Sequence, residues 1–150
     1  MSAPLTIRDV RAGDFGAWLQ LWDDYNASAE RVVSAETTTT TWVRFLDPAE
    51  PINALAAEAG DGRLVGFVHY LYHRDTVAMG LVCYLADLFT APSMRGQGGG
   101  RALVEAVYTR AKAAGSPSVY WLTHESNDVA RRLYDKMATN FGFIAYQKDL

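Results

Sequence analysis

The chain has very little of the chemistry that forms disulfides or binds metal ions. Its single cysteine, Cys83, cannot form an internal disulfide and has no partner for a Cys-x-x-Cys redox or metal pair. The three histidines, His69, His73 and His124, do not stand at a spacing typical of a metal site. We therefore expect no bound metal, a reducing compartment, and packing or surface roles for these side chains.

Runs of positive charge and long apolar runs are also missing. The formal net charge is −3, and no stretch of lysines and arginines is long enough to act as a basic arm, which disfavours nucleic-acid binding. The first residues reach a charge at Arg8 without the apolar stretch of a signal peptide or membrane span. We expect a cytoplasmic protein that binds neither membranes nor nucleic acid. An anionic small ligand is still compatible with this charge, because a helix N-terminus and an arginine can hold phosphate.

What the chain does have is the composition of one globular domain. Of its 150 residues, 49% are hydrophobic and 21% charged. This balance allows a buried core and differs from that of disordered chains, which are rich in charge and poor in aromatic residues. No internal repeat or linker interrupts it. The sequence predicts a single domain over residues 1–150.

Hydrophobic periodicity predicts alternating strands and helices. After a short strand at residues 5–8, a helix capped by Asp14 presents an aromatic stripe that we expect in the core, and a short second helix includes the threonine run 37–41. The later predicted elements are a hairpin of strands at 52–58 and 64–72, a strand at 83–90, a helix after the glycines at 96–100, a strand at 119–123, a helix at 127–137 and a closing strand at 143–148. This order predicts an α/β fold in which helices flank a mixed, mostly antiparallel sheet.

The glycine-rich segment before the third helix is the most informative part of the sequence. Four of the five residues from Gly96 to Gly100 are glycines. A backbone without Cβ atoms can come close to a ligand, and the unpaired N–H groups of a first helical turn attract an anion. Arg95 and Arg101 add positive charge on either side. The segment predicts a phosphate-binding turn, although a flexible turn without a ligand would also explain the glycines alone.

Two common phosphate-binding motifs do not fit this segment. A P-loop needs Gly-Lys-Ser or Gly-Lys-Thr at its end, whereas Gly100 is followed by Arg101 and Ala102. A Rossmann fingerprint starting at Gly96 needs a third glycine at position 101 and an acidic residue about twenty positions later, where the chain has Tyr120. The ligand is therefore of another kind.

The same segment resembles the Arg/Gln-x-x-Gly-x-Gly/Ala signature of the Gcn5-related N-acetyltransferases (GNAT), as Arg95-Gly96-Gln97-Gly98-Gly99-Gly100. A second resemblance follows in order: residues 127–134 are similar to the family's Asn-x-x-Ala-x-x-Leu-Tyr segment, and residues 141–143 to the start of its final strand. The two motifs extend the resemblance over residues 84–148. Residues 119–127 are most like the branch of polyamine and histone acetyltransferases.

The resemblance implies the GNAT fold and an N-acetyltransferase that uses acetyl-coenzyme A (acetyl-CoA) and no metal. It implies that the pyrophosphate of coenzyme A lies against the backbone of residues 97–100, and that the strand end at residues 88–90 offers a backbone N–H to the reacting carbonyl oxygen. Asn127 would hydrogen-bond the pantetheine arm, although a helix-capping role would explain it equally well. The residues expected to bind the cofactor are Leu88, Phe89, Thr90, Arg95, Gly96, Gln97, Gly98, Gly99, Gly100, Arg101, Asn127 and Arg131.

Tyr134 and Asp87 are the candidate catalytic residues under this resemblance. Tyr134 matches the family's usual proton donor to the departing thiolate; because its reference pKa of about 10 exceeds the value of about 8.5 for a thiol, its hydroxyl would mainly hydrogen-bond the sulfur. An amine with a pKa of about 10.4 must lose a proton before it attacks. Asp87 is a candidate base, although strand alternation could turn it into a structural residue. Glu30 and Glu36 are candidates for an acidic rim that binds the substrate amine.

The sequence is compatible with more than one kind of acceptor. We interpret the chain first as an acetyltransferase acting on a primary amine of a small molecule, such as a polyamine or amino acid. The alternatives are a protein lysine or N-terminus as acceptor, and a non-catalytic sensor that only binds coenzyme A. Polyamine enzymes often carry an acid at the position of Ala86, and residues 135–141 lengthen the usual connection after Tyr134. Family analogy predicts a homodimer.

Overall fold

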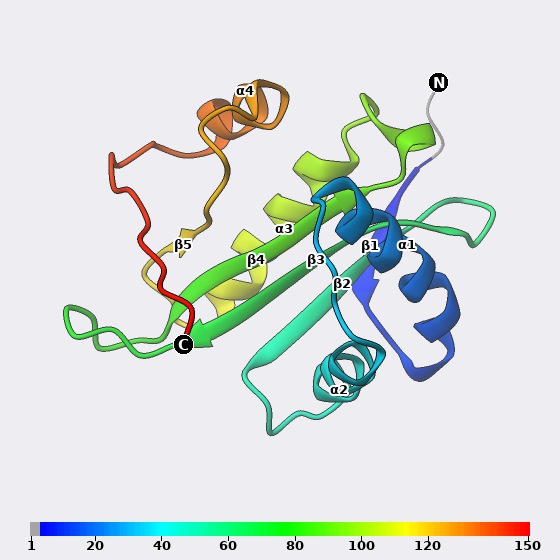
Figure 1. The fold of residues 1–150 in the computed structure, drawn as a ribbon, viewed down its shortest axis with the longest axis horizontal. Helices are drawn as coiled ribbons and strands as arrows, with labels where there is room; N and C mark the ends of the chain where they lie inside the picture. The colour runs from blue at the N-terminus through cyan, green and yellow to red at the C-terminus, as the bar shows by residue number, and fades with distance from the viewer. Residues whose placement is uncertain (1–3) are drawn as a thin grey trace.

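Helices pack on a central sheet in residues 4–150, the part of the chain that the computed structural model describes (Figure 1). The sheet has the order β1-β2-β3-β4-β5; the first four strands are antiparallel to one another in sequence, and β5 runs parallel to β4. None of the helices within these residues is long and apolar enough to cross a membrane. The elements are β1 (Thr6–Asp9), η1 (Ala12–Asp14), α1 (Phe15–Ser28), α2 (Ala35–Phe45), β2 (Ile52–Glu58), β3 (Leu64–His73), β4 (Val82–Thr90), η2 (Pro92–Met94), α3 (Gly99–Ala113), β5 (Val119–Tyr120) and α4 (Asp128–Met137). The predicted mixed, mostly antiparallel α/β fold is confirmed.

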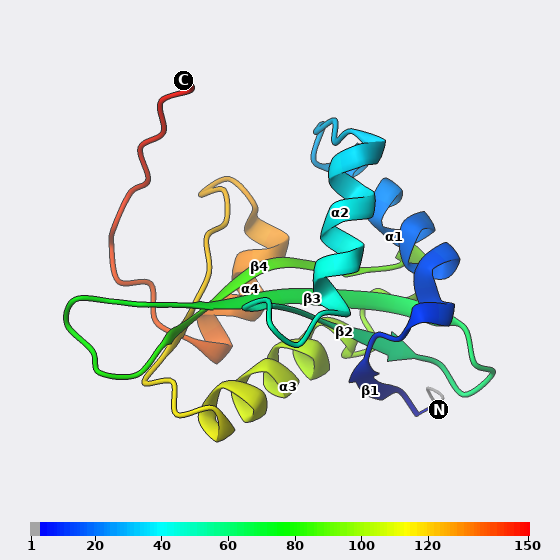
Figure 2. The same cartoon turned by 90° about the horizontal axis from the view of Figure 1, so that it is seen from below.

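The C-terminal segment corrects one prediction. The closing strand expected over residues 143–148 is absent: through Leu150, the described chain has no strand after β5. Residues 138–150 instead run away from the sheet (Figure 2). A strand needs a neighbouring edge for its backbone hydrogen bonds, and β5 offers an edge of only two residues. The strand expected over residues 119–123 is also shorter than predicted, Val119–Tyr120, because the chain leaves the edge of β4 after Tyr120.

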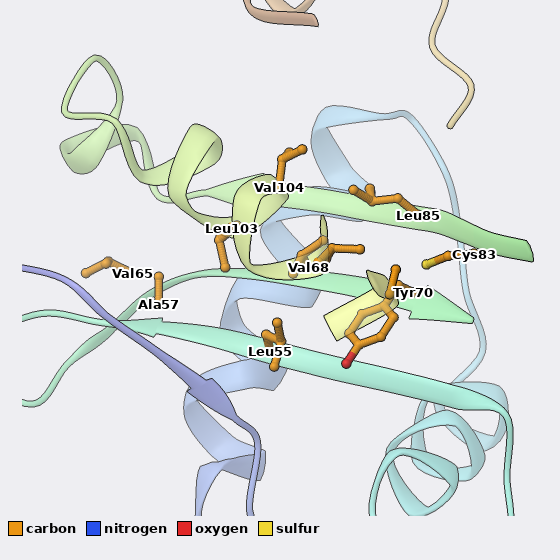
Figure 3. Close-up of a cluster of buried hydrophobic side chains, with 11 residues drawn as sticks. Leu55, Ala57, Val65, Val68, Tyr70, Cys83, Leu85, Leu103 and Val104 are labelled. Atoms are coloured by element: carbon orange, nitrogen blue, oxygen red, sulfur yellow. The ribbon is translucent and has the colours of Figure 1, made fainter. Parts of the chain in front are cut away.

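The first apolar cluster lies between α3 and one face of the sheet (Figure 3). Leu103 and Val104 of α3 are completely buried in one cluster with Leu55 and Val68 of the central strands. Cys83 belongs to this cluster, and burial raises the pKa of its thiol to about 11. The thiol is therefore protonated at neutral pH, and Cys83, completely buried in β4, has a packing role.

The second apolar cluster lies on the opposite face, where α1 and α2 cover the sheet (Figure 2). Trp18 and Trp22 of α1 stack with 5.6 Å between their ring centroids, and Trp42 of α2 lies 4.9 Å from Trp18. All three indoles are buried together with Phe67 and Phe89 of the sheet. The aromatic stripe predicted for the first helix is confirmed as core.

Asp14 precedes α1 as predicted, but it does not cap that helix with its side chain. Its Oδ2 atom accepts hydrogen bonds from the Arg8 guanidinium at 2.8 Å and from the backbone N–H of Arg11 at 2.9 Å. Arg8 also donates to Glu58 at 2.6 Å, so one guanidinium joins two strands to the start of α1. These bonds from Arg8 lower the pKa of Asp14 despite partial burial.

Helix α2 forms although its sequence contains five consecutive threonines. The side chain of Ser34 accepts a hydrogen bond from the backbone N–H of Thr37 at 3.1 Å and caps the helix. The buried hydroxyl of Thr38 accepts from Nε1 of Trp22 at 3.1 Å. The cap and the packing against α1 outweigh the low intrinsic helix preference of threonine.

Candidate active site

The strands β4 and β5 separate after a short parallel contact and leave an opening in the sheet. They pair only at Cys83 with Val119 and at Tyr84 with Tyr120. Beyond these pairs lies a cavity of about 140 Å³. Its wall consists of residues from β4, from the chain after β5, and from α1 and α4: Tyr25, Leu85, Ala86, Leu88, Trp121, Leu122, Thr123, Asn127 and Tyr134.

A bulge in β4 lies directly at this cavity. His69 of β3 pairs with Asp87, whereas the next residue, Tyr70, pairs with Leu85, so Ala86 has no partner on β3. A bulge turns a strand locally and changes where its side chains point. The predicted donor residues Leu88, Phe89 and Thr90 follow the bulge in regular register with β3, and of these Leu88 lines the cavity.

Tyr134 and Asn127, the two residues that the second sequence motif singled out, both line the cavity. Tyr134 is half-buried, with its ring edge to face against Trp121 at a centroid distance of 5.3 Å. Burial raises the pKa of its hydroxyl, which is therefore protonated at neutral pH. Asn127 is the N-cap of α4, because its Oδ1 accepts from the backbone N–H of Ala130 at 3.3 Å. Its capping role is thus confirmed, and its binding role stays a prediction.

The glycine-rich turn has the backbone that its sequence predicted. Gly96 and Gly98 adopt φ values of 78° and 82°, in the left-handed region that strains other residues. Gly98 is the N-cap of α3, whose first-turn N–H groups have no acceptors within the helix. The Arg95 guanidinium lies 5.8 Å from the ring centroid of Phe89, and Arg101 pairs with Glu105 at 2.9 Å. Backbone N–H groups and two cations therefore gather at one end of α3.

Asp87 is joined to the cavity wall by Tyr25, whose hydroxyl donates to its Oδ1 at 2.9 Å. The other oxygen, Oδ2, lies 3.0 Å from Nδ1 of His69. On the far side of that ring, Nε1 of Trp18 lies 3.0 Å from Nε2 of His69. Because an indole N–H can only donate, Nε2 must be the acceptor, and the proton of the neutral imidazole is on Nδ1. His69 therefore donates to Asp87 and holds its carboxylate in place.

The electrostatics of this network favour an ionised Asp87 and a neutral His69. Burial disfavours the carboxylate, but the hydrogen bonds from His69 and Tyr25 and the charge of Arg31 outweigh it and lower the pKa of Asp87. Complete burial lowers the pKa of His69 more than the neighbouring Asp87 raises it. Burial and the negative charge of Asp87 raise the pKa of Tyr25. At neutral pH, one negative charge is thus held beside the cavity by neutral donors and one arginine.

Several predicted residues lie outside the cavity wall. Glu30 follows the end of α1 and Glu36 is in the first turn of α2; both are exposed, and neither lines the cavity. Arg131 donates to the backbone carbonyl of Glu125 at 2.6 Å and so holds the loop before α4. Sequence reasoning missed Tyr25, which it assigned only to the core, and the bond between His69 and Asp87. No local sequence pattern marks Tyr25 or His69 as a neighbour of Asp87.

A model of the acetyltransferase (GNAT) family matches residues 18–138. The chain belongs to this family. It is therefore a GNAT N-acetyltransferase, in a family that uses acetyl-CoA. D-amino-acid N-acetyltransferase HPA3 of Saccharomyces cerevisiae is 36% identical to this GNAT protein over 146 residues, which cover 97% of this chain and 91% of the yeast protein.

Solved structures show the same GNAT fold. AAC(6')-Iy in complex with the bisubstrate analogue CoA-S-monomethyl-acetylneamine superposes with a TM-score of 0.86, and 99% of each chain is covered. Ribosomal-protein-alanine N-acetyltransferase from Brucella melitensis biovar Abortus 2308 superposes with a TM-score of 0.81 and covers 98% of this chain and all of its own. Both are 18% identical to this GNAT chain, so they establish its fold.

Proposed function

We propose that the protein transfers the acetyl group of acetyl-CoA directly to the primary amine of a small, amino-acid-like molecule. The opening between β4 and β5 carries this proposal, because it brings Tyr134 into one cavity with Tyr25, the hydrogen-bond partner of an ionised Asp87. The relative HPA3 is a D-amino-acid N-acetyltransferase, which supports a small amine as acceptor.

The residues of the glycine turn fit the phosphates of acetyl-CoA. Residues 97–100 and the first turn of α3 would hydrogen-bond the pyrophosphate through backbone N–H groups, and Arg95 and Arg101 would add charge. The pantetheine arm would enter between β4 and the chain after β5, where Asn127 lines the cavity. The bulge at Ala86 interrupts the β3–β4 ladder where backbone donors could stabilise the negative charge developing on the carbonyl oxygen.

Tyr134 would act on the departing sulfur. Attack by the amine breaks the bond between the acetyl carbon and the sulfur, and the thiolate then needs a proton or a hydrogen-bond donor. The half-buried hydroxyl of Tyr134 keeps its proton at neutral pH and can donate to the sulfur. Because its pKa is raised further above that of a thiol, we assign it mainly a hydrogen-bonding role.

Asp87 would bind the amine before the reaction. Its lowered pKa makes it a weak base, so it is better suited to attract an ammonium group than to take its proton at neutral pH. We therefore assign proton loss from the amine to water reached through the open cavity. Asp87 and Tyr25 would hold the nitrogen near the acetyl group while that proton leaves.

The proposal is tested by measuring thiol release from acetyl-CoA with free amino acids, polyamines and lysine peptides, together with mass spectrometry of the product. We expect release only in the presence of amine, with an N-acetyl amino acid as product. Turnover restricted to peptides would make a protein the acceptor and overturn the proposal. Binding of acetyl-CoA without turnover of any amine would identify a sensor instead.

Replacing Gly98 by Ala should raise the dissociation constant for acetyl-CoA about tenfold. The left-handed backbone of Gly98 costs other residues about 1–2 kcal/mol, so the turn would relax and its N–H groups would move away from the phosphates. Isothermal titration calorimetry measures this change.

Gly100→Ala is the matched control for that measurement. A Cβ atom at Gly100 would lie 3.7 Å from Leu133, an ordinary contact, and the family signature allows alanine at this position. Its dissociation constant should stay within about threefold of the wild type. Equal losses in both variants would contradict the assigned role of the Gly98 backbone.

We further infer that two copies form a dimer by pairing residues 143–148 of each with the β5 edge of the other. Phe143, Ile144 and Tyr146 are exposed, and the segment runs away from its own sheet. β-branched and aromatic residues of this kind favour strands once an edge is available. Exchange of identical segments is a common route to twofold dimers.

Deleting residues 139–150 should convert this dimer into a monomer, with the mass of one shortened chain. The full chain has a mass of 16.5 kDa, and we expect light scattering to give about twice that value for it. Ile144→Asp should give monomers without shortening the chain, whereas Val77→Asp, in the exposed loop after β3, should not. A monomeric wild type, or a dimeric truncated chain, would overturn the inference.

A further inference from the structure

Arg31 occupies a position that its local backbone and side-chain contacts define closely. The preceding residue, Glu30, has a φ of 53° and is the one non-glycine residue with positive φ among residues 4–150. Such a conformation is unfavourable and persists only when surrounding contacts hold it. Here both the backbone N–H and the Nε of Arg31 donate to the buried Asn26, at 2.9 Å and 2.8 Å. The turn after α1 thus fixes the direction of this side chain.

The guanidinium of Arg31 lies on an aromatic surface next to the cavity. Its central carbon is 5.5 Å from the ring centroid of Trp22 and 5.2 Å from that of Tyr25. Tyr25 lines the cavity, and its hydroxyl binds Asp87. The contacts with the two rings and the bond from Nε to Asn26 hold the guanidinium in place, while its outer N–H groups remain available to a ligand.

Arg31 and Asp87 form a loose pair of opposite charges. Nη2 of Arg31 lies 3.5 Å from Oδ1 of Asp87, at the limit of a hydrogen bond. The Arg31 side chain is 45% exposed, whereas that of Asp87 is 14% exposed and already accepts from Tyr25 and His69. The Arg31 guanidinium is therefore accessible to a ligand, and the Asp87 carboxylate beside it is held in place by hydrogen bonds.

A ligand with an ammonium group and a carboxylate attached to the same carbon complements the charges of Arg31 and Asp87. An α-amino acid carries its ammonium and carboxylate on the same carbon, which separates them by about the distance between Arg31 and Asp87. We propose that Arg31 binds the α-carboxylate of the acceptor through its outer N–H groups, while Asp87 receives the α-ammonium group. This assignment rests on the proposed transfer to a small amine and makes Arg31 the residue that selects amino acids.

The same geometry disfavours a polyamine. A polyamine has no carboxylate for Arg31 and places further positive charge near a fixed guanidinium, which costs binding energy. A planar guanidinium and a carboxylate form two parallel hydrogen bonds, a pairing that lysine cannot reproduce. Selection would therefore depend on the shape of the guanidinium as well as on its charge.

The test compares three acceptors that share one side chain: phenylalanine in both enantiomers, phenylalaninamide and phenethylamine. Only the amino acid carries a carboxylate. For Arg31→Gln, we expect the ratio of kcat/KM for the amino acid to kcat/KM for the amide to fall about 10- to 150-fold, mainly through KM. Arg31→Lys should recover only part of the loss. Arg44→Gln, an exposed arginine of α2, is the matched control and should keep the wild-type ratio.

The outcomes separate this assignment from the proposed function. An equal loss with all three acceptors would show that Arg31 only supports the fold, which a fall in melting temperature would reveal independently. A wild-type enzyme that prefers the amide or the amine to both amino-acid enantiomers would also overturn the assignment, while acetyl transfer itself would stand. No thiol release with any acceptor would overturn the proposed function instead.

Discussion

Replacing Tyr134 by Phe should lower kcat for acetyl transfer by about 100-fold or more, with little change in the KM for acetyl-CoA. Losing one positioned hydrogen-bond donor to the charge that develops in a transition state costs about 100- to 1,000-fold in kcat, and this variant removes the hydroxyl while its ring still packs on Trp121. Steady-state assays of thiol release measure the effect, and calorimetry confirms that the cosubstrate still binds.

Tyr72→Phe is the matched control for this prediction. Tyr72 of β3 is a half-buried tyrosine with a pKa raised by burial, but it lies outside the cavity wall. Its loss of a hydroxyl should leave kcat within about twofold of the wild type. If Tyr134→Phe kept full activity as well, another group would stabilise the departing sulfur, and the catalytic role of Tyr134 would be wrong.

Replacing Trp18 by Ala should lower the free energy of unfolding by about 3–5 kcal/mol. The indole is 1% exposed and packs on Trp22 and Trp42, so its removal leaves a cavity in the second cluster. It also removes the donor to Nε2 of His69, which would leave a buried acceptor without a partner. Small domains are stable by only about 5–15 kcal/mol, so this variant should be close to unfolding.

Equilibrium denaturation in urea measures this loss, with Val43→Ala as the control. Val43 lies on the exposed side of α2, and its truncation should change the free energy of unfolding by about 0.5 kcal/mol or less. Trp18→Phe keeps most of the packing and isolates the hydrogen bond to His69. A loss below about 1 kcal/mol for Trp18→Ala would show that the second cluster contributes little to stability.

The parts of the site that could be predicted are those whose signals are local. The glycine turn is one such part, because left-handed backbone at Gly96 and Gly98 requires glycine and the following helix is strongly periodic. Tyr134 is another, because it follows Asn127 at a fixed spacing along one helix. In both cases neighbours in the sequence are also neighbours in space, so the sequence pattern was enough to predict how these residues are arranged.

The parts that could not be predicted depend on contacts between distant segments. Tyr25 and Asp87 are 62 positions apart, and His69 and Asp87 are 18 apart. Tyr25 belongs to an apolar helical stripe and therefore resembled core alone. The strand predicted at residues 143–148 is absent for a related reason. The segment has strand-forming residues, but a strand also requires a neighbouring edge, which the segment's own sequence cannot supply.

The short pairing between β4 and β5 divides the molecule into two regions of unequal stability. Val119 and Tyr120 are the whole of β5, and α4 has no fully buried residue, whereas β2, β3, β4 and α3 share the main cluster. Regions with few buried contacts open locally without global unfolding. One wall of the cavity, with Trp121, Asn127 and Tyr134, belongs to the weaker region. A molecule bound across the cavity joins the two regions, and its binding energy therefore also supports the folding of the last thirty residues.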